Sequence, residues 1–192
     1  MIQTDNFQKV EVTSSSDLRT WLEQNHQQKE SVWLVTYLKV VPEKYLSREE
    51  VLDELICFGW IDGIRRKLDD RRTMQLISPR RVQHWAQTYK DRAAKLIAEG
   101  KMHEAGFRSI DYSKQVGLWD FMDDVDRLEV PRDLQEGLDQ IPGASDFFHG
   151  INDSSKRFVL RWLKLAKTEK TRKARIQQLA ELSGRGEKLK GS

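Results

Sequence analysis

Residues 52–85 read LDELICFGWIDGIRRKLDDRRTMQLISPRRVQHW, and this stretch decides the fold. Its apolar residues recur at helical spacing as far as Gly59, which predicts a helix that ends in a left-handed glycine cap. Residues 60–68 and 72–78 then flank Asp69 and Asp70, an arrangement typical of a β-hairpin. The stretch therefore predicts a helix followed by two antiparallel strands.

Side-chain alternation sorts the first strand of this hairpin into two faces. One face is expected to carry Trp60, Asp62, Ile64, Arg66 and Leu68. The other is expected to carry Ile61, Gly63, Arg65 and Lys67. A carboxylate on an apolar face is costly unless it is paired. We therefore expect a cationic partner for Asp62, with Arg80 or Arg81 as the candidates.

The rest of the chain predicts further helices and strands around this hairpin. Residues 31–41, SVWLVTYLKVV, form the strongest strand, and both of its faces are apolar, so we expect it to be covered on both sides, at least in part. A capping box at residues 47–50 starts the helix before the hairpin. After Pro131 only helical spacing remains, with Asp153 or Ser154 as a cap and Gly184 as the last stop.

These patterns predict an α+β fold with a small antiparallel sheet of about three or four strands, packed with helices and followed by an α-helical C-terminal region. We divide the chain into an α+β core at residues 1–115, an acidic connection at residues 116–130, and a helical segment at residues 131–192. At 192 residues the chain can bury one good core with a small appended domain.

Composition limits the classes of protein that the chain can represent. It is 38% hydrophobic and 33% charged, and it has no run of about 18 apolar residues, so no membrane insertion is expected. The first residues, MIQTDNFQKVEV, lack the features of a secretory signal. One cysteine, Cys57, cannot form an internal disulfide or a cysteine metal cluster. Together these observations predict a cytoplasmic protein.

The net charge of +3 conceals four blocks of opposite sign. Residues 65–95 carry ten Lys and Arg against three Asp and Glu, and residues 155–192 carry twelve against three. Residues 1–64 and 111–140 are acidic. Such blocks either neutralise one another and sit in water, or the two basic blocks form an anion-binding face. The sequence leaves both alternatives open.

Recognised catalytic and metal-binding patterns are absent from the sequence. The four histidines are scattered, so the helical zinc pair is missing, and no phosphate-binding glycine loop or nucleophile elbow occurs. The acids at residues 120–126 lack the spacing of a calcium loop, which favours a solvated face over a divalent-cation site. We predict no catalytic residue, cofactor or metal, although an enzyme acting on a small anionic substrate stays an alternative.

Several strings also point to a known family: CFGWIDG at residues 57–63, LDDR at 68–71, SPRR at 78–81 and LIAEGKM at 96–102. Through them the chain resembles the YdeI/OmpD-associated, OmdA-type bacteriocin-protection family of bacterial proteins. Matching positions in the C-terminal part are Trp162, Ala166, Lys167, Glu169, Thr171, Arg172, Arg175 and Ile176. The resemblance covers most of residues 30–183.

Two departures from the family pattern follow the SPRR string. The segment that leads to Trp85 is one residue shorter than usual, and Tyr89 stands where the family carries an asparagine. The resemblance implies an α+β core related to the YjbR/CyaY-like folds, a helical tail, and a role in envelope stress, namely tolerance of antimicrobial peptides or bacteriocins. It transfers no catalytic residue, and frataxin-like iron binding would be an analogy of fold alone.

The leading functional hypothesis is a non-enzymatic binding protein whose partner is an unknown small anionic ligand or a protein. Arginine forks bind carboxylate or phosphate bidentately, and indole rings can wall an apolar part of a ligand. The candidate ligand-binding residues are Trp60, Asp62, Arg65, Arg66, Arg80, Arg81 and Trp85. A cationic peptide would instead dock on the acidic residues 120–129.

Nucleic-acid binding is the alternative from a different class. The basic hairpin and the basic C-terminal helices would contact phosphates, and such contacts would make binding steeply dependent on salt. The candidate residues are Lys67, Arg71, Arg72, Arg157, Arg161 and Arg172. No recognised nucleic-acid motif accompanies them.

Overall fold

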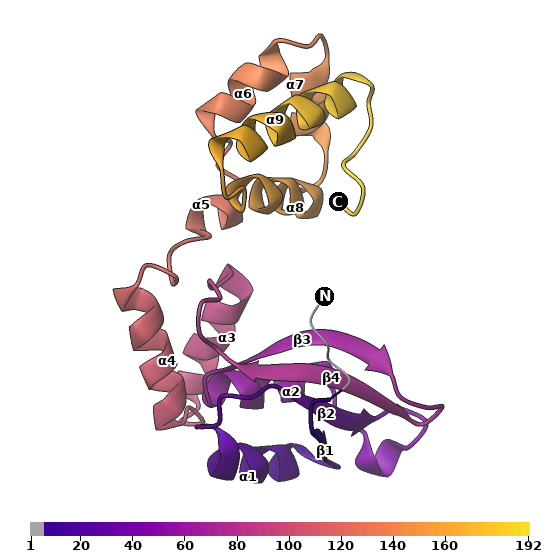
Figure 1. The fold of residues 1–192 in the computed structure, drawn as a ribbon, viewed down its shortest axis with the longest axis vertical. Coiled ribbons are helices and arrows are strands. Elements are labelled where there is room, and N and C mark those ends of the chain that lie inside the picture. Colours follow the sequence, from indigo (N-terminus) through magenta and orange to yellow (C-terminus); the bar gives the residue numbers. More distant parts are fainter. Residues whose placement is uncertain (1–5) are drawn as a thin grey trace. The chain divides into compact units, whose positions relative to one another are not determined.

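The computed structural model describes residues 6–192, and the first five residues of the predicted core lie outside the described part. The chain divides into two compact units, Met1–Asp120 and Phe121–Ser192. Each unit has its own cluster of buried apolar side chains. The first unit combines a sheet with helices and the second is helical, which confirms the predicted α+β class with a helical C-terminal region (Figure 1).

The first unit contains the predicted helix and hairpin between further elements. In chain order it comprises β1 (Lys9–Glu11), α1 (Ser15–Asn25), β2 (Val32–Tyr37), the short 3-10 helix η1 (Pro42–Lys44), α2 (Arg48–Cys57), β3 (Trp60–Lys67), β4 (Arg72–Pro79), α3 (Gln87–Ala98) and α4 (Glu104–Gln115). Ser47 and Glu50 form the predicted capping box of α2. Gly59, at φ 70°, lets the chain leave α2 and enter β3 at once.

The sheet has the strand order β1-β2-β4-β3. The β2–β4 and β3–β4 pairs are antiparallel, as predicted, whereas β1 pairs with β2 in parallel. The expectation of a purely antiparallel sheet was therefore wrong in this one pair. The two strands are parallel because helix α1 connects them and carries the chain back to the end at which β1 began.

A β-bulge in β3 changes which side chains share a face. Asp62 pairs with Ile77 and Arg65 pairs with Gln75, so Gly63 and Ile64 together oppose a single residue of β4. Because one extra residue reverses the alternation of side chains, Arg65 lies on the same face as Asp62. The prediction that these two residues occupy opposite faces was wrong for this reason.

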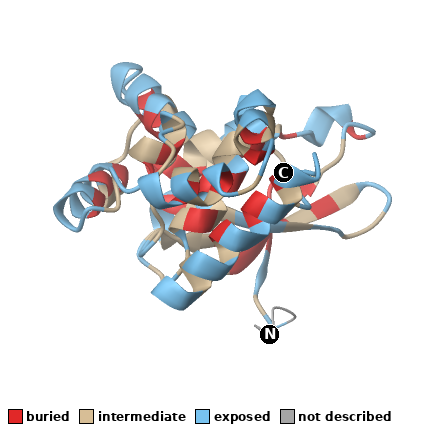
Figure 2. Cartoon of the chain, turned by 90° about the horizontal axis from the view of Figure 1, so that it is seen from above, coloured by how far each residue is buried: buried red, intermediate tan, exposed pale blue. Residues whose placement is uncertain are grey.

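Apolar side chains of the helices and the sheet form the core of the first unit. Leu18 of α1, Leu55 of α2 and Leu34 of β2 are fully buried in it. Trp33 and Val35, on the other face of β2, are also buried, which confirms the expectation that this strand is covered on both faces. Figure 2 shows buried residues on the inner sides of the helices and exposed residues on their outer sides.

The second unit is a group of helices with its own core. They are α5 (Asp123–Asp126), α6 (Arg132–Asp139), α7 (Ala144–Gly150), α8 (Asp153–Lys164) and α9 (Glu169–Gly184). Residues 116–130, predicted as a connection, contribute α5, and Val125 of this helix is buried in the core. Pro131 caps α6 instead of opening it, and Asn152 caps α8 in place of the predicted Asp153 or Ser154.

Across residues 6–192, no helix is both long enough and apolar enough to span a bilayer.

Candidate functional site

A hollow of about 320 Å³ lies between α2 and the bulged strand β3. Its lining residues are Arg48, Val51 and Leu52 of α2, Asp62, Gly63 and Arg65 of β3, and Gln75 of β4. Two features of the sequence build it. The capping box fixes the first turn of α2, where Arg48 stands. The bulge brings Arg65 to the side of the sheet that carries Asp62.

The two arginines give the hollow its positive character. Arg65 is half-buried and donates a hydrogen bond from Nη2 to Oε1 of Gln75, 2.7 Å away. Burial lowers the pKa of Arg65, and the neighbouring charge of Arg48 lowers it further, more strongly than Asp62 raises it. Within the described residues no carboxylate forms an ion pair with either arginine. Unpaired arginines at a hollow suit an anionic ligand.

Asp62 is held by two neutral side chains. The hydroxyl of Tyr89 donates to Oδ1 at 2.7 Å, and Nε2 of Gln75 donates to Oδ2 at 3.1 Å. The predicted ion pair with Arg80 or Arg81 was wrong, because both guanidinium groups donate to backbone carbonyls, Arg80 to those of Gln83 and His84 and Arg81 to that of Lys29. Gln75 also accepts from Arg65, so one amide fixes Asp62 and Arg65 relative to each other.

Arg80 packs against the ring of Tyr89, which in turn donates to Asp62. Its guanidinium carbon lies 4.1 Å from the ring centroid of Trp85 and 5.6 Å from that of Tyr89, and Nη1 donates to the carbonyls of Gln83 at 3.3 Å and His84 at 3.5 Å. Burial lowers the pKa of Arg80 to about 10, although Tyr89 and Asp62 act in the opposite direction. Arg80 is therefore a buried cation that packs against the rings of Trp85 and Tyr89.

The remaining predicted ligand-binding residues lie elsewhere. Trp60 and Trp85 are each only 1% exposed and belong to the core, so they do not wall the hollow. Arg66 lies on the opposite face of the sheet, over the ring of Trp33 at 5.2 Å. Arg81 donates to the backbone carbonyl of Lys29 at 2.6 Å. Of the seven predicted residues, the structure thus brings Asp62 and Arg65 to the hollow. Arg80 does not line it but packs against Tyr89, the partner of Asp62.

Sequence reasoning missed three residues of this site, namely Arg48, Gln75 and Tyr89. Arg48 stood in the capping segment, and nothing in its neighbours indicates that the helix start faces a strand. Gln75 had one available signal, because it lies two residues from Ile77 and therefore on the buried face of its strand. Tyr89 was placed on the apolar stripe of a helix and noted as the residue that replaces the family's asparagine, without a role in the site.

The residues of the nucleic-acid alternative fall into two groups. Lys67, Arg72 and Arg172 form ion pairs with carboxylates of Asp70, of Glu11 and Asp69, and of Asp133, respectively. Arg71, Arg157 and Arg161 have no ion-pair partner among residues 6–192. Half of the predicted cations are therefore already neutralised within the fold.

Residues 127–186 match the model of a family described as bacteriocin-protection, YdeI or OmpD-associated. This match covers 60 of the 192 residues. Residues 10–109, which are 100 of the 192 residues, match a second model, a domain of unknown function (DUF8412). The chain belongs to this second family, and the match includes the CFGWIDG string. The two matches fall in different compact units. The hollow between α2 and β3 lies within residues 10–109, the DUF8412 match. The searches of curated proteins and of solved structures returned no match.

The YdeI/OmpD-associated segment, residues 127–186, overlaps the end of the acidic residues 120–129. Asp124 pairs with Lys164 at 2.5 Å, Glu129 with Arg127 at 2.6 Å, and Asp120 of the first unit with Lys90 at 3.6 Å. Within the described part of the chain, no three His, Cys, Asp or Glu side chains are grouped to hold a metal. Much of the acidic charge expected to receive a cationic peptide is therefore balanced by neighbouring cations.

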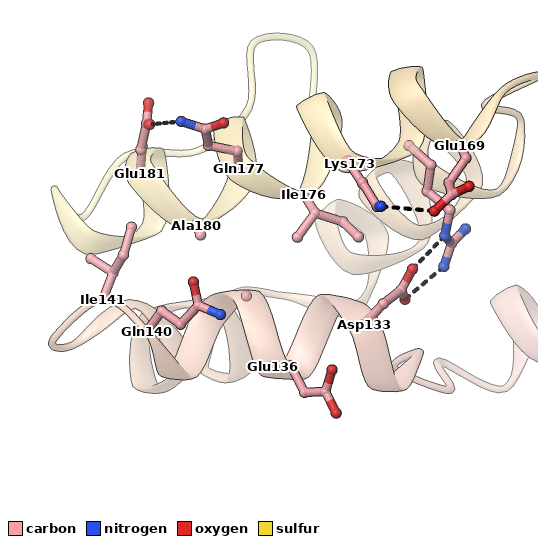
Figure 3. Close-up of a pocket in the computed structure, with 12 residues that line it drawn as sticks. Asp133, Glu136, Gln140, Ile141, Glu169, Lys173, Ile176, Gln177, Ala180 and Glu181 are labelled. Carbon is pink, nitrogen blue, oxygen red and sulfur yellow. Dashed lines mark hydrogen bonds and ion pairs between the residues drawn. The ribbon is translucent and has the colours of Figure 1, made fainter.

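A larger groove of about 740 Å³ lies between α6 and α9 of the YdeI/OmpD-associated segment (Figure 3). Four of its six charged groups form two ion pairs: Arg172 with Asp133 at 2.6 Å and Lys173 with Glu169 at 2.8 Å. Figure 3 shows Glu136 pointing away from the space between the two helices. Size alone favours this groove, whereas the unpaired arginines favour the hollow between α2 and β3 as the ligand site.

Proposed function

We propose that the protein is a cytoplasmic, non-enzymatic binding protein that takes a small anionic ligand in the hollow between α2 and β3, in the setting of envelope stress. The observation that carries the proposal is the pair Arg48 and Arg65, which line one hollow without a carboxylate partner in the described chain. The match of residues 127–186 to a family described by bacteriocin protection supports a role in envelope stress.

Electrostatics favours an anion at this place. Burial lowers the pKa of Arg65, and the charge of Arg48 lowers it further, because the two like charges repel each other. An anion between them would relieve this repulsion and accept hydrogen bonds from both guanidinium groups. A hydrogen bond to a charged group contributes roughly 1.5–3 kcal/mol, so loss of one arginine should weaken binding by roughly tenfold to a hundredfold.

The test is a titration of the full chain with inorganic phosphate and with acetate. Binding is measured by isothermal calorimetry and by the NMR signals of the arginine side chains. The variants are Arg48→Met and Arg65→Met. Arg71→Met is the matched control, because Arg71 is also unpaired and belongs to the same hairpin but lies outside this hollow.

We expect both hollow variants to lose binding and the control to keep it. Binding that survives in Arg48→Met and Arg65→Met, or that disappears in Arg71→Met, would place the anion elsewhere. Failure of every small anion, including hydroxy- and amino-carboxylates as well as phosphate and acetate, to bind the wild-type protein would reject the proposal.

A second candidate function is nucleic-acid binding through α8, where Arg157 and Arg161 have no ion-pair partner among residues 6–192. Fluorescence anisotropy with labelled single- and double-stranded oligonucleotides tests it at about 50 and about 200 mM salt. Binding that falls by about a hundredfold or more across this range, and that the double variant Arg157→Met/Arg161→Met loses, would favour this candidate. Binding that neither salt nor the variant changes would exclude it.

A further inference from the structure

Asp62 is the one acid among the lining residues of the hollow, on the same face of β3 as Arg65, and it restricts the ligand. We infer that the ligand is a small carboxylate that carries an amine or a hydroxyl next to its anionic group, and that Asp62 selects for this donor. The inference rests on the proposed function, because it assumes that Arg48 and Arg65 hold the anionic group.

Asp62 is fixed in place but not saturated. Tyr89 and Gln75 each donate one hydrogen bond, at 2.7 and 3.1 Å, to different oxygens of the carboxylate. A carboxylate has about four acceptor positions, so two positions remain for a ligand that enters the hollow. Because Gln75 also holds Arg65, the acceptor and one of the arginines have a fixed separation. A ligand that bridges them needs an acceptor and a donor at a matching separation.

The charges of the hollow favour a single negative charge on the ligand. Arg48, Arg65 and Asp62 together contribute one net positive charge to the lining. A ligand that brings only negative charge meets repulsion from Asp62, and a dianion such as phosphate meets more of it than a monoanion. A donor on the ligand turns this repulsion into a charge-assisted hydrogen bond. At about 320 Å³ the hollow suits a small metabolite.

The test uses three acids that differ only at carbon 2, namely propionate, L-lactate and L-alanine, which carry hydrogen, hydroxyl and ammonium there. Dissociation constants are measured on the full chain by NMR titration, following the side-chain signals of Arg65 and Gln75. The wild-type protein should bind L-lactate and L-alanine about tenfold more tightly than propionate, as one charge-assisted hydrogen bond predicts.

The variant Asp62→Asn should remove this preference while leaving the binding of propionate equal or tighter. Asp70→Asn is the matched control, because Asp70 lies at the hairpin turn and its side chain is 93% exposed. The wild-type series also decides the question without any variant, in case Asp62→Asn fails to fold.

The outcomes distinguish a failure of selection by Asp62 from a failure of the proposed function. Equal binding of all three acids that still requires Arg48 and Arg65 would overturn the selection by Asp62 and keep the proposed function. A preference for the donors that Asp62→Asn retains would also overturn it. If none of the acids binds at Arg65, both the inference and the proposed function fail.

Discussion

Replacing Gly106 by alanine should separate α4 from the end of α2. An added Cβ would overlap the carbonyl oxygen of Cys57 and the sulfur of Met102, and it would lie 2.9 Å from the carbonyl carbon of Cys57. The same carbonyl accepts the N–H of His103 at 3.2 Å, so a shift of α4 would also weaken this hydrogen bond.

The expected loss of stability follows from three contributions. Overpacking costs about 1–3 kcal/mol, and the upper part of that range applies because a backbone carbonyl cannot rotate away as a side chain can. The weakened hydrogen bond adds about 1 kcal/mol. Alanine regains about 1 kcal/mol over glycine in helix propensity. The free energy of unfolding of the first unit should therefore fall by about 2–3 kcal/mol.

Urea unfolding followed by tryptophan fluorescence measures this change, since five of the six tryptophans lie in the first unit. The control is Gly150→Ala at the end of α7, where an added Cβ meets nothing within 4 Å. Because Gly150 lies in the second unit, we expect the control to leave the free energy of unfolding of the first unit unchanged. A Gly106→Ala protein within about 0.5 kcal/mol of wild type, below the expected overpacking cost, would refute the close contact between α4 and α2.

Two further predictions concern the polar contacts. Tyr89→Phe should lower the free energy of unfolding by about 1–2 kcal/mol, because it removes a donor from the half-buried Asp62. A double-mutant cycle with Asp62→Asn should show a coupling energy of about 0.5 kcal/mol or more. Additive effects of the two substitutions would contradict the contact. In the second unit, the hydrogen bond from Arg172 lowers the pKa of Asp133, so the pair stabilises the folded state above about pH 4 and ceases to do so as the pH falls through the lowered folded pKa. Arg172→Met should therefore cost about 0.5–1 kcal/mol at neutral pH and less as the pH falls below about 4, as measured by urea unfolding. An equal cost at neutral pH and at pH 2 would contradict the pairing.

Local signals in the sequence predicted much of the fold. The capping box of α2 and the glycine after it depend on residues within a few positions of each other, and so do the strands around Asp69 and Asp70. Helix α7 was missed because it is short and its N-cap, Gly143, offers no capping side chain. The parallel pairing of β1 depends on a crossover, which leaves no mark in a three-residue strand.

The candidate site could be predicted only in part, because it depends on contacts between distant segments. The bulge adds one residue to β3 without interrupting its pattern, so the sequence placed Arg65 on the wrong face. The partners of Asp62 come from β4 and α3, at residues 75 and 89, and neither position carries a signal of proximity. Arg80 and Arg81 looked like better partners because opposite charge is the one signal that a sequence displays directly.

Cys57 gives the first unit a built-in reporter of native-state opening. It is the only cysteine of the chain, it is 1% exposed, and burial raises the pKa of its thiol to about 11. A thiol reagent needs the exposed thiolate, so at neutral pH it should react only in molecules where the end of α2 has transiently opened. The labelling rate would then measure the opening free energy of this unit alone, while the second unit, which has no cysteine, stays silent.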